Sequence, residues 1–137
     1  MGSIRIALVD CDPENICRFS RVIRRTGYTY ILSVYSDSLA PLCEITERNM
    51  PDIIVIDWFL PARPTDWFLP VLDAPAFVAE LRSIAGLERL TVVVLLPADW
   101  PEGQQDGFES FLFLKKPIGE TQMKNLIALA SEQASSR

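Results

Sequence analysis

Short, almost wholly apolar runs that stop at turn residues are the feature that most restricts the fold of this chain. Ile4–Val9 stops at the turn Asp10-Cys11-Asp12-Pro13, and the run 53–56 stops at Asp57. Further apolar runs cover residues 28–35, 90–96 and 111–114. Such runs, bounded by turn signals, are typical of buried strands. Strands of a half-exposed sheet would alternate apolar with polar residues, so these runs predict a parallel sheet covered on both faces.

Helix signals lie between the runs. Asp12 can cap a helix, Pro13 suits its first position and Gly27 ends it. The apolar face of this helix comprises Ile16, Phe19, Val22 and Ile23. A second helix is predicted over 38–48, and a last one over 119–134 with Met123, Leu126, Ile127 and Ala130 inward. Strands that alternate with amphipathic helices predict a doubly wound α/β fold, and 137 residues are enough for a single domain over 1–137.

Two stretches interrupt this alternation. Residues 58–73 are rich in proline and aromatics, and residues 99–107 have room for only a short fourth helix. The pentapeptide Asp-Trp-Phe-Leu-Pro at 57–61 recurs at 66–70, which favours a tandem duplication over a recurring recognition motif. The loop inserted after strand three carries large apolar side chains that either fold back on the next helix or form an interaction surface: Trp58, Trp67, Phe68 and Leu69.

Composition excludes several classes of function. The formal net charge of −5 argues against nucleic-acid binding, and no apolar run is long enough for a membrane span. The absence of histidine excludes Ser-His-Asp and Cys-His catalysis. Cys11, Cys17 and Cys43 fit no disulfide or zinc spacing, and no secretory leader is recognisable. We therefore expect a cytoplasmic protein.

Three charged residues follow predicted strands. Asp10 follows the first, Asp57 the third and Lys116 the fifth. Ligands of open parallel sheets bind at the carboxyl ends of the strands, so these side chains can converge there. Carboxylates attract Mg²⁺, and a lysine contacts phosphoryl oxygens. The alternative is that the aspartates are turn and cap residues and that Lys116 is solvated.

In order and spacing, these segments resemble the receiver domains of two-component response regulators over nearly the whole chain. The matching pieces are residues 8–14, 50–57 with Leu60-Pro61 after them, 92–98, and Lys116-Pro117. The resemblance implies a flavodoxin-like five-stranded sheet of order 2-1-3-4-5 and a signalling module rather than an enzyme. It implies Asp57 as the phosphoacceptor, Lys116 as a phosphoryl contact, and a cis peptide bond between Lys116 and Pro117. It also implies a Mg²⁺ site formed by Asp10, Asp57 and the backbone carbonyl of Phe59.

The chain departs from the family at three positions. Cys11 replaces the acidic residue that ligates the metal, so we expect weakly bound Mg²⁺ unless Asp12 reaches it through water. Pro97 replaces the Ser or Thr whose hydroxyl contacts the phosphoryl group. Phe113 keeps the ring of the family's switch aromatic without a hydroxyl, and simple core packing is the alternative for it.

The duplication leaves two candidate acceptors. Asp57 ends an apolar strand, whereas Asp66 has the family's spacing to Asp73; we prefer Asp57 because a strand positions it. The resemblance implies phosphotransfer from a histidine kinase or phosphotransfer protein, and contact with a downstream protein partner, with a homodimer left open. The main alternative is a degenerate receiver that acts as a phosphorylation-independent interaction module. A small α/β enzyme is the least favoured alternative, because the chain lacks a glycine-rich phosphate loop.

Overall fold

The computed structural model describes residues 3–37, 39–60, 72–83, 90–99 and 112–135. Its centre is a five-stranded sheet, parallel as the sequence pattern predicts and of order β2-β1-β3-β6-β7 as the resemblance implies. The strands are β1 (Ile4–Val9), β2 (Tyr30–Tyr35), β3 (Ile53–Asp57), β6 (Thr91–Leu96) and β7 (Leu112–Lys115). The helices are α1 (Pro13–Arg25), α2 (Leu39–Glu44), α3 (Ala74–Arg82) and α4 (Glu120–Ser135), with a 3₁₀ turn, η1, at Glu47–Asn49.

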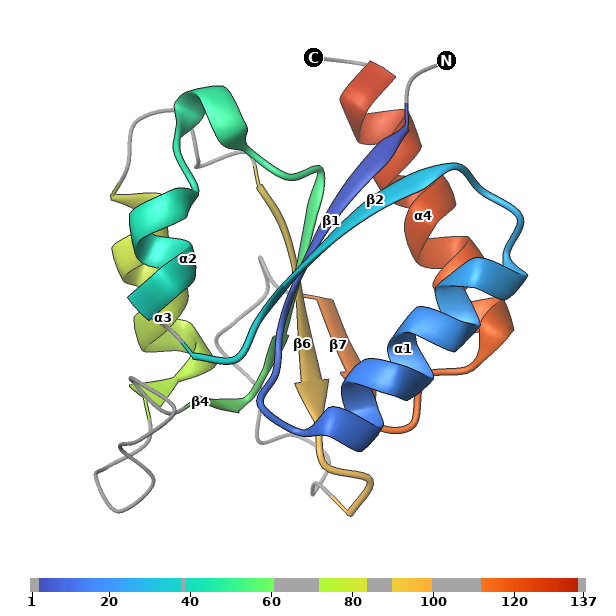
Figure 1. Cartoon of the computed structure of the whole chain (residues 1–137), viewed down its shortest axis with the longest axis horizontal. Helices are drawn as coiled ribbons and strands as arrows, with labels where there is room; N and C mark the ends of the chain where they lie inside the picture. The colour runs from blue at the N-terminus through green and yellow to red at the C-terminus, as the bar shows by residue number, and fades with distance from the viewer. Residues whose placement is uncertain (1–2, 38, 61–71, 84–89, 100–111, 136–137) are drawn as a thin grey trace.

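Helices cover both faces of the sheet, and the central strands are buried accordingly. Figure 1 shows α1 and α4 on one side of the strands and α2 and α3 on the other. All six residues of β6 and the first four of β3 are buried. Alternate residues of the strands point to opposite faces of the sheet and belong to two apolar clusters. One cluster includes Phe77 and Leu81 of α3, and the other includes Ile23 of α1 and Ile127 of α4. Burial on both faces explains why these strands contain no polar alternation.

Helix α1 forms as its sequence signals predict. The Asp12 side chain accepts a hydrogen bond from the backbone N–H of Glu14 at 3.0 Å, and Pro13 occupies the first turn. Gly27 follows the helix with a φ of +81°, a conformation that residues with a Cβ rarely adopt. Cap and stop residues therefore fix where the chain leaves β1 and where it returns to β2.

The second helix is shorter than the predicted 38–48. α2 ends at Glu44, and the chain becomes extended at Thr46 before η1. The Asn49 side chain donates to the Glu44 carbonyl at 3.2 Å, which satisfies an acceptor at the helix end. Ile45, between them, is buried at 1% exposure, so tertiary packing sets this boundary where helical periodicity does not.

The ends of the predicted loop insertion are tied together. β4 (Phe59–Leu60) pairs antiparallel with β5 (Leu72–Asp73), directly before α3. Residues 61–71, with Asp66, Trp67, Phe68 and Leu69, lie outside the described residues. The same is true of all but the first residue of 99–107, where a short fourth helix is predicted. Within the described ranges, every helix is too short or too polar to span a lipid bilayer.

Candidate functional site

The three charged residues that the sequence places after strands do converge. Lys116 Nζ lies 3.3 Å from Asp57 Oδ1 and 3.7 Å from Asp10 Oδ2. β1 pairs with β3 and β3 with β6, all in parallel, so the carboxyl ends of these strands lie next to one another at the same end of the sheet. Lys116 follows β7, which pairs in parallel with β6, so its carboxyl end lies at the same end of the sheet. We call Asp10, Asp57 and Lys116 the charged cluster.

Backbone hydrogen bonds hold the ends of these strands in place. The N–H of Asp10 donates to the Tyr35 carbonyl at 3.0 Å, and the N–H of Lys116 donates to the Leu96 carbonyl at 2.9 Å. The N–H of Trp58 donates to the Leu95 carbonyl at 3.1 Å, directly after Asp57. The Lys116-Pro117 bond is cis, as the resemblance implies. Sequence analysis did not identify these backbone acceptors, because any residue type can supply a carbonyl.

Asp10 is the most enclosed member of the charged cluster. Its side chain is 0% exposed, and its Oδ1 accepts a hydrogen bond from the N–H of Asp12 at 2.9 Å. Asp10 Oδ2 has no hydrogen-bond partner within the described part of the chain, because Lys116 at 3.7 Å is too far for one. A buried carboxylate oxygen left in this way favours an additional positive group at the site.

Burial raises the pKa of the Asp57 carboxyl above its ordinary value; Lys116 opposes this rise and Asp10 adds to it. Between the ordinary and the raised pKa, the folded protein keeps a proton that the unfolded chain has released. Ionisation of Asp57 therefore lowers the free energy of unfolding, and the decrease takes place as pH increases from the ordinary to the raised pKa. An anionic nucleophile that is partly desolvated is also more reactive than one in water.

We expect Asp57→Asn to become progressively more stable than the wild type as pH increases above about 3.8, the ordinary value for this carboxyl. The asparagine has no charge to desolvate, so the variant lacks this pH-dependent cost. Urea denaturation of both proteins at a series of pH values measures the difference. A difference that shrinks with increasing pH would mean that the Lys116 ion pair outweighs burial.

Cys11 lies beside the charged cluster but does not complete a metal site. Burial, and then the charges of Asp10 and Asp57, raise the pKa of its thiol, so the neutral form is favoured. Across the described ranges, no group of three or more His, Cys, Asp or Glu side chains is placed to hold a metal ion. The Asp12 side chain caps α1. The donors present are two carboxylates, a set that fits Mg²⁺ with several waters or phosphate oxygens but is sparse.

Trp58 corrects one part of the predicted interaction surface. Its side chain is only 9% exposed and belongs to the same apolar cluster as Phe77 and Val78 of α3. Its ring centroid lies 6.4 Å from that of Phe113, with the planes tilted by 43°. Trp58 is thus part of the core rather than of an exposed loop, which matches the alternative of aromatics folded on the next helix. Trp58 is buried because it follows β3 directly and its backbone N–H donates to the Leu95 carbonyl of β6, which holds it against the sheet.

Pro97 and Phe113, the other two departures from the family pattern, lie at the end of one predicted strand and within another. Pro97 follows β6 directly and is half-buried, so the end of this strand has neither a side-chain hydroxyl nor an N–H to offer. Phe113 is half-buried on β7 and packs against the apolar cluster that contains Trp58. Phe59, the predicted carbonyl ligand, is the first residue of β4.

Comparison with solved structures identifies the fold. The signal receiver domain of an HD domain-containing protein from Pseudomonas fluorescens has a TM-score of 0.75 at 19% identity, covering 100% of this chain and 93% of that chain. A two-component response regulator from Legionella pneumophila has a TM-score of 0.70 at 19% identity, covering 95% and 99%. The receiver domain of a sensor histidine kinase from Pseudomonas aeruginosa, with magnesium coordinated in its active-site cleft, has a TM-score of 0.70 at 20% identity, covering 98% and 99%.

No protein-family model and no curated protein matches the sequence. The structural likenesses, at 19–20% identity, establish the fold. The chain therefore has the receiver fold, with the strand order that the resemblance implies.

Proposed function

We propose that this chain is a receiver that accepts a phosphoryl group on Asp57 from a histidine kinase or phosphotransfer protein and signals by contact with another protein. The observation that carries the proposal is the charged cluster. A lysine lies 3.3 Å from a carboxylate at the end of a central strand, with a second, fully buried carboxylate beside it. This arrangement lies at the carboxyl ends of the parallel strands, where open α/β folds such as the receiver fold bind their ligands.

The side chains support a direct displacement at phosphorus. Asp57 attacks with a carboxylate oxygen, an acyl phosphate bond forms, and the bond between phosphorus and the donor atom breaks with its electron pair leaving on the donor. The Lys116 ammonium stabilises negative charge on the phosphoryl oxygens. Lys116 and Asp57 are only 22% and 17% exposed, and partial removal from solvent makes this electrostatic interaction stronger than it would be in water.

A divalent cation adds charge neutralisation at the phosphoryl oxygens when it is bound. Asp10, Asp57 and the Phe59 carbonyl would hold Mg²⁺, whereas the Asp12 side chain, the candidate water-mediated ligand, caps α1. Asp10 Oδ2 is buried and has no hydrogen-bond partner among the described residues, so a bound cation would compensate the desolvation of this oxygen. The neutral Cys11 thiol is a poor ligand for a hard cation, so binding is weak.

Cys11→Asp should tighten Mg²⁺ binding by about tenfold or more, because it adds an oxygen ligand beside Asp10 and Asp57. The extra like charge should also lower the free energy of unfolding when no metal is present. Calorimetric titration with Mg²⁺ measures the affinity. Cys17→Asp is the matched control, since Cys17 is an exposed cysteine on α1. Equal affinities for the two variants would show that position 11 does not face the metal.

The alternative function is a phosphorylation-independent interaction module with the receiver fold. Cys11 and Pro97 favour it, because each removes a group that the family uses at the site. Incubation with acetyl phosphate and Mg²⁺, followed by intact-mass measurement, separates the two functions. The proposal predicts that a species heavier by one phosphoryl group forms with Mg²⁺. This species should not form when EDTA replaces Mg²⁺ in the incubation. No labelled species at high donor concentration would leave only the interaction module.

We further propose that residues 1–137 form one domain with a signalling rather than a catalytic role, located in the cytoplasm. The described elements support one domain, because all of the long strands join one sheet.

A further inference from the structure

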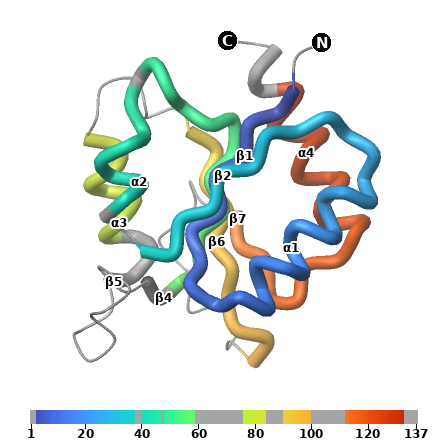
Figure 2. Tube along the Cα trace, in the orientation of Figure 1, coloured from blue at the N-terminus to red at the C-terminus, as the bar shows by residue number. Residues whose placement is uncertain are grey.

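Strand β2 forms one edge of the five-stranded sheet. Figure 2 shows it in front of β1, with α1 and α4 to one side and α2 to the other. Within the described ranges, its only strand neighbour is β1. The carbonyls of Thr29 and Tyr35 accept hydrogen bonds from Ile4 and Asp10. Because backbone direction alternates along a strand, Tyr30, Leu32 and Val34 present their N–H and C=O groups to the outer edge.

The sequence of β2 lacks the residue types that usually protect an edge strand. Residues 28–36 contain no charged residue and no proline. Tyr28, Ile31 and Val34 are 43%, 51% and 43% exposed, three of the five most exposed large apolar side chains in the described part of the chain. Edge strands normally carry lysine, proline or a bulge that prevents pairing with another strand. The strand at the opposite end of the sheet, β7, has only four residues and ends in Lys115.

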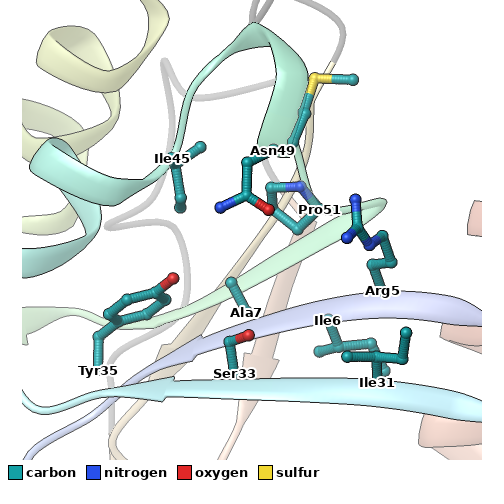
Figure 3. Close-up of a pocket in the computed structure, with 10 residues that line it drawn as sticks. Arg5, Ile6, Ala7, Ile31, Ser33, Tyr35, Ile45, Asn49 and Pro51 are labelled. Carbon is teal, nitrogen blue, oxygen red and sulfur yellow. The ribbon is translucent and has the colours of Figure 1, made fainter.

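A hollow runs beside the same edge. It has a volume of about 50 Å³ and lies between the β1–β2 surface and the η1 turn. In Figure 3, Ile31, Ser33 and Tyr35 line it from β2, and Asn49 and Pro51 line it from the opposite side. When an extended segment adds to a sheet edge, main-chain hydrogen bonds supply affinity and such hollows receive alternate side chains.

We infer that the β2 edge pairs with the β2 edge of a second copy of this chain, antiparallel about a two-fold axis perpendicular to the sheet. In the register centred on Leu32, Leu32 lies opposite itself and Tyr30 lies opposite Val34. All three outward-facing residues then exchange backbone hydrogen bonds, and the two sheets become continuous. A two-fold axis closes the assembly at a dimer.

Charge identifies a second copy as the occupant. Arg24 and Arg25 end α1, the helix that precedes β2, whereas Asp37 lies two residues after the last residue of β2. In the antiparallel arrangement the start of one β2 lies beside the end of the other, so the basic end of each copy meets the acidic end of its partner. The paired strands themselves bury no charge, because residues 28–36 have none.

The first test is the oligomeric state in solution, measured by sedimentation over a concentration series. The wild type should reach a dimer, and Val34→Lys should weaken dimerisation by about tenfold or more, which corresponds to 1.4 kcal/mol. Leu129→Lys is the matched control, since Leu129 on α4 is 37% exposed and lies away from this edge. Its dimerisation should equal that of the wild type. A wild type that stays monomeric, or a dimer that Val34→Lys leaves unchanged, would overturn the inference.

The second test fixes the register and does not depend on a charged variant that folds. In a background with serine at positions 11, 17 and 43, Leu32→Cys should form a symmetric disulfide on mild oxidation. Hydrogen-bonded antiparallel pairs have Cα atoms about 5.5 Å apart, within the range of disulfides. Ile31→Cys should cross-link much less, because each Ile31 lies opposite Ser33. Equal cross-linking would contradict this pairing, and a monomer that binds a synthetic peptide of residues 28–36 would make an extended peptide the occupant.

Discussion

Trp58→Ala is expected to lower the free energy of unfolding by about 3–5 kcal/mol, as large-to-small changes of buried aromatic residues do. The Trp58 side chain is 9% exposed and packs among residues of β3, β6 and α3. Its ring also contacts that of Phe113 from β7. Removal of the indole leaves a cavity beneath the sheet that the surrounding strands can only partly close. Urea denaturation at neutral pH measures the loss.

Two further variants make this prediction specific. Trp58→Phe keeps an aromatic ring and should cost clearly less than Trp58→Ala. Leu129→Ala removes a side chain that is 37% exposed on α4, and its cost should fall within the range of surface substitutions, about 0.5 kcal/mol. A cost for Trp58→Ala as small as that of Leu129→Ala would place the indole on the surface and restore the prediction of an exposed interaction residue.

Asp57→Asn is expected to abolish labelling by acetyl phosphate, whereas Asp66→Asn should leave it unchanged. An asparagine amide is not a nucleophile for phosphorus, so no acyl phosphate can form. Asp57 is the residue that β3 holds 3.3 Å from Lys116. Asp66 belongs to the second copy of the pentapeptide and has no apolar strand before it in the sequence. Intact-mass measurement after equal incubation times compares the three proteins.

Retained labelling of Asp57→Asn, together with loss in Asp66→Asn, would transfer the acceptor role to the duplicated segment. Far-ultraviolet circular dichroism of each variant establishes that a loss of labelling reflects chemistry and not unfolding. Lys116→Ala adds a graded outcome: labelling should slow rather than vanish, because Lys116 stabilises charge and does not form the covalent bond.

The sheet was predictable from sequence because burial on both faces leaves an uninterrupted apolar signal. β1 and β3 match the predicted runs to within one residue, and their order follows the receiver resemblance. The charged cluster was predictable for the same reason, since a parallel sheet brings the ends of its strands to one edge. The cap Asp12 and the stop Gly27 are local signals that tertiary contacts do not override.

Other features depend on contacts that sequence periodicity does not contain. α2 stops at Glu44 because buried Ile45 and the Asn49 side chain set the end of the helix. Trp58 stands in a segment rich in proline and aromatics, which suggested an exposed loop, but it follows β3 without interruption and is buried with it. The resemblance implies that strand two lies at the edge of the sheet, but the exposure of its apolar side chains was missed, because an apolar edge strand and an apolar central strand have the same sequence pattern.

Chemical trapping of the phosphorylated side chain tests directly whether Asp57 is the phosphoacceptor. Borohydride reduces an aspartyl phosphate to homoserine, so reduction after incubation with acetyl phosphate marks the acceptor permanently. Peptide mapping by tandem mass spectrometry then locates the modified residue. We expect homoserine at position 57 and unmodified aspartate at positions 10, 12 and 66. Homoserine at any of those three positions with aspartate intact at 57, or no homoserine at all, would contradict this expectation.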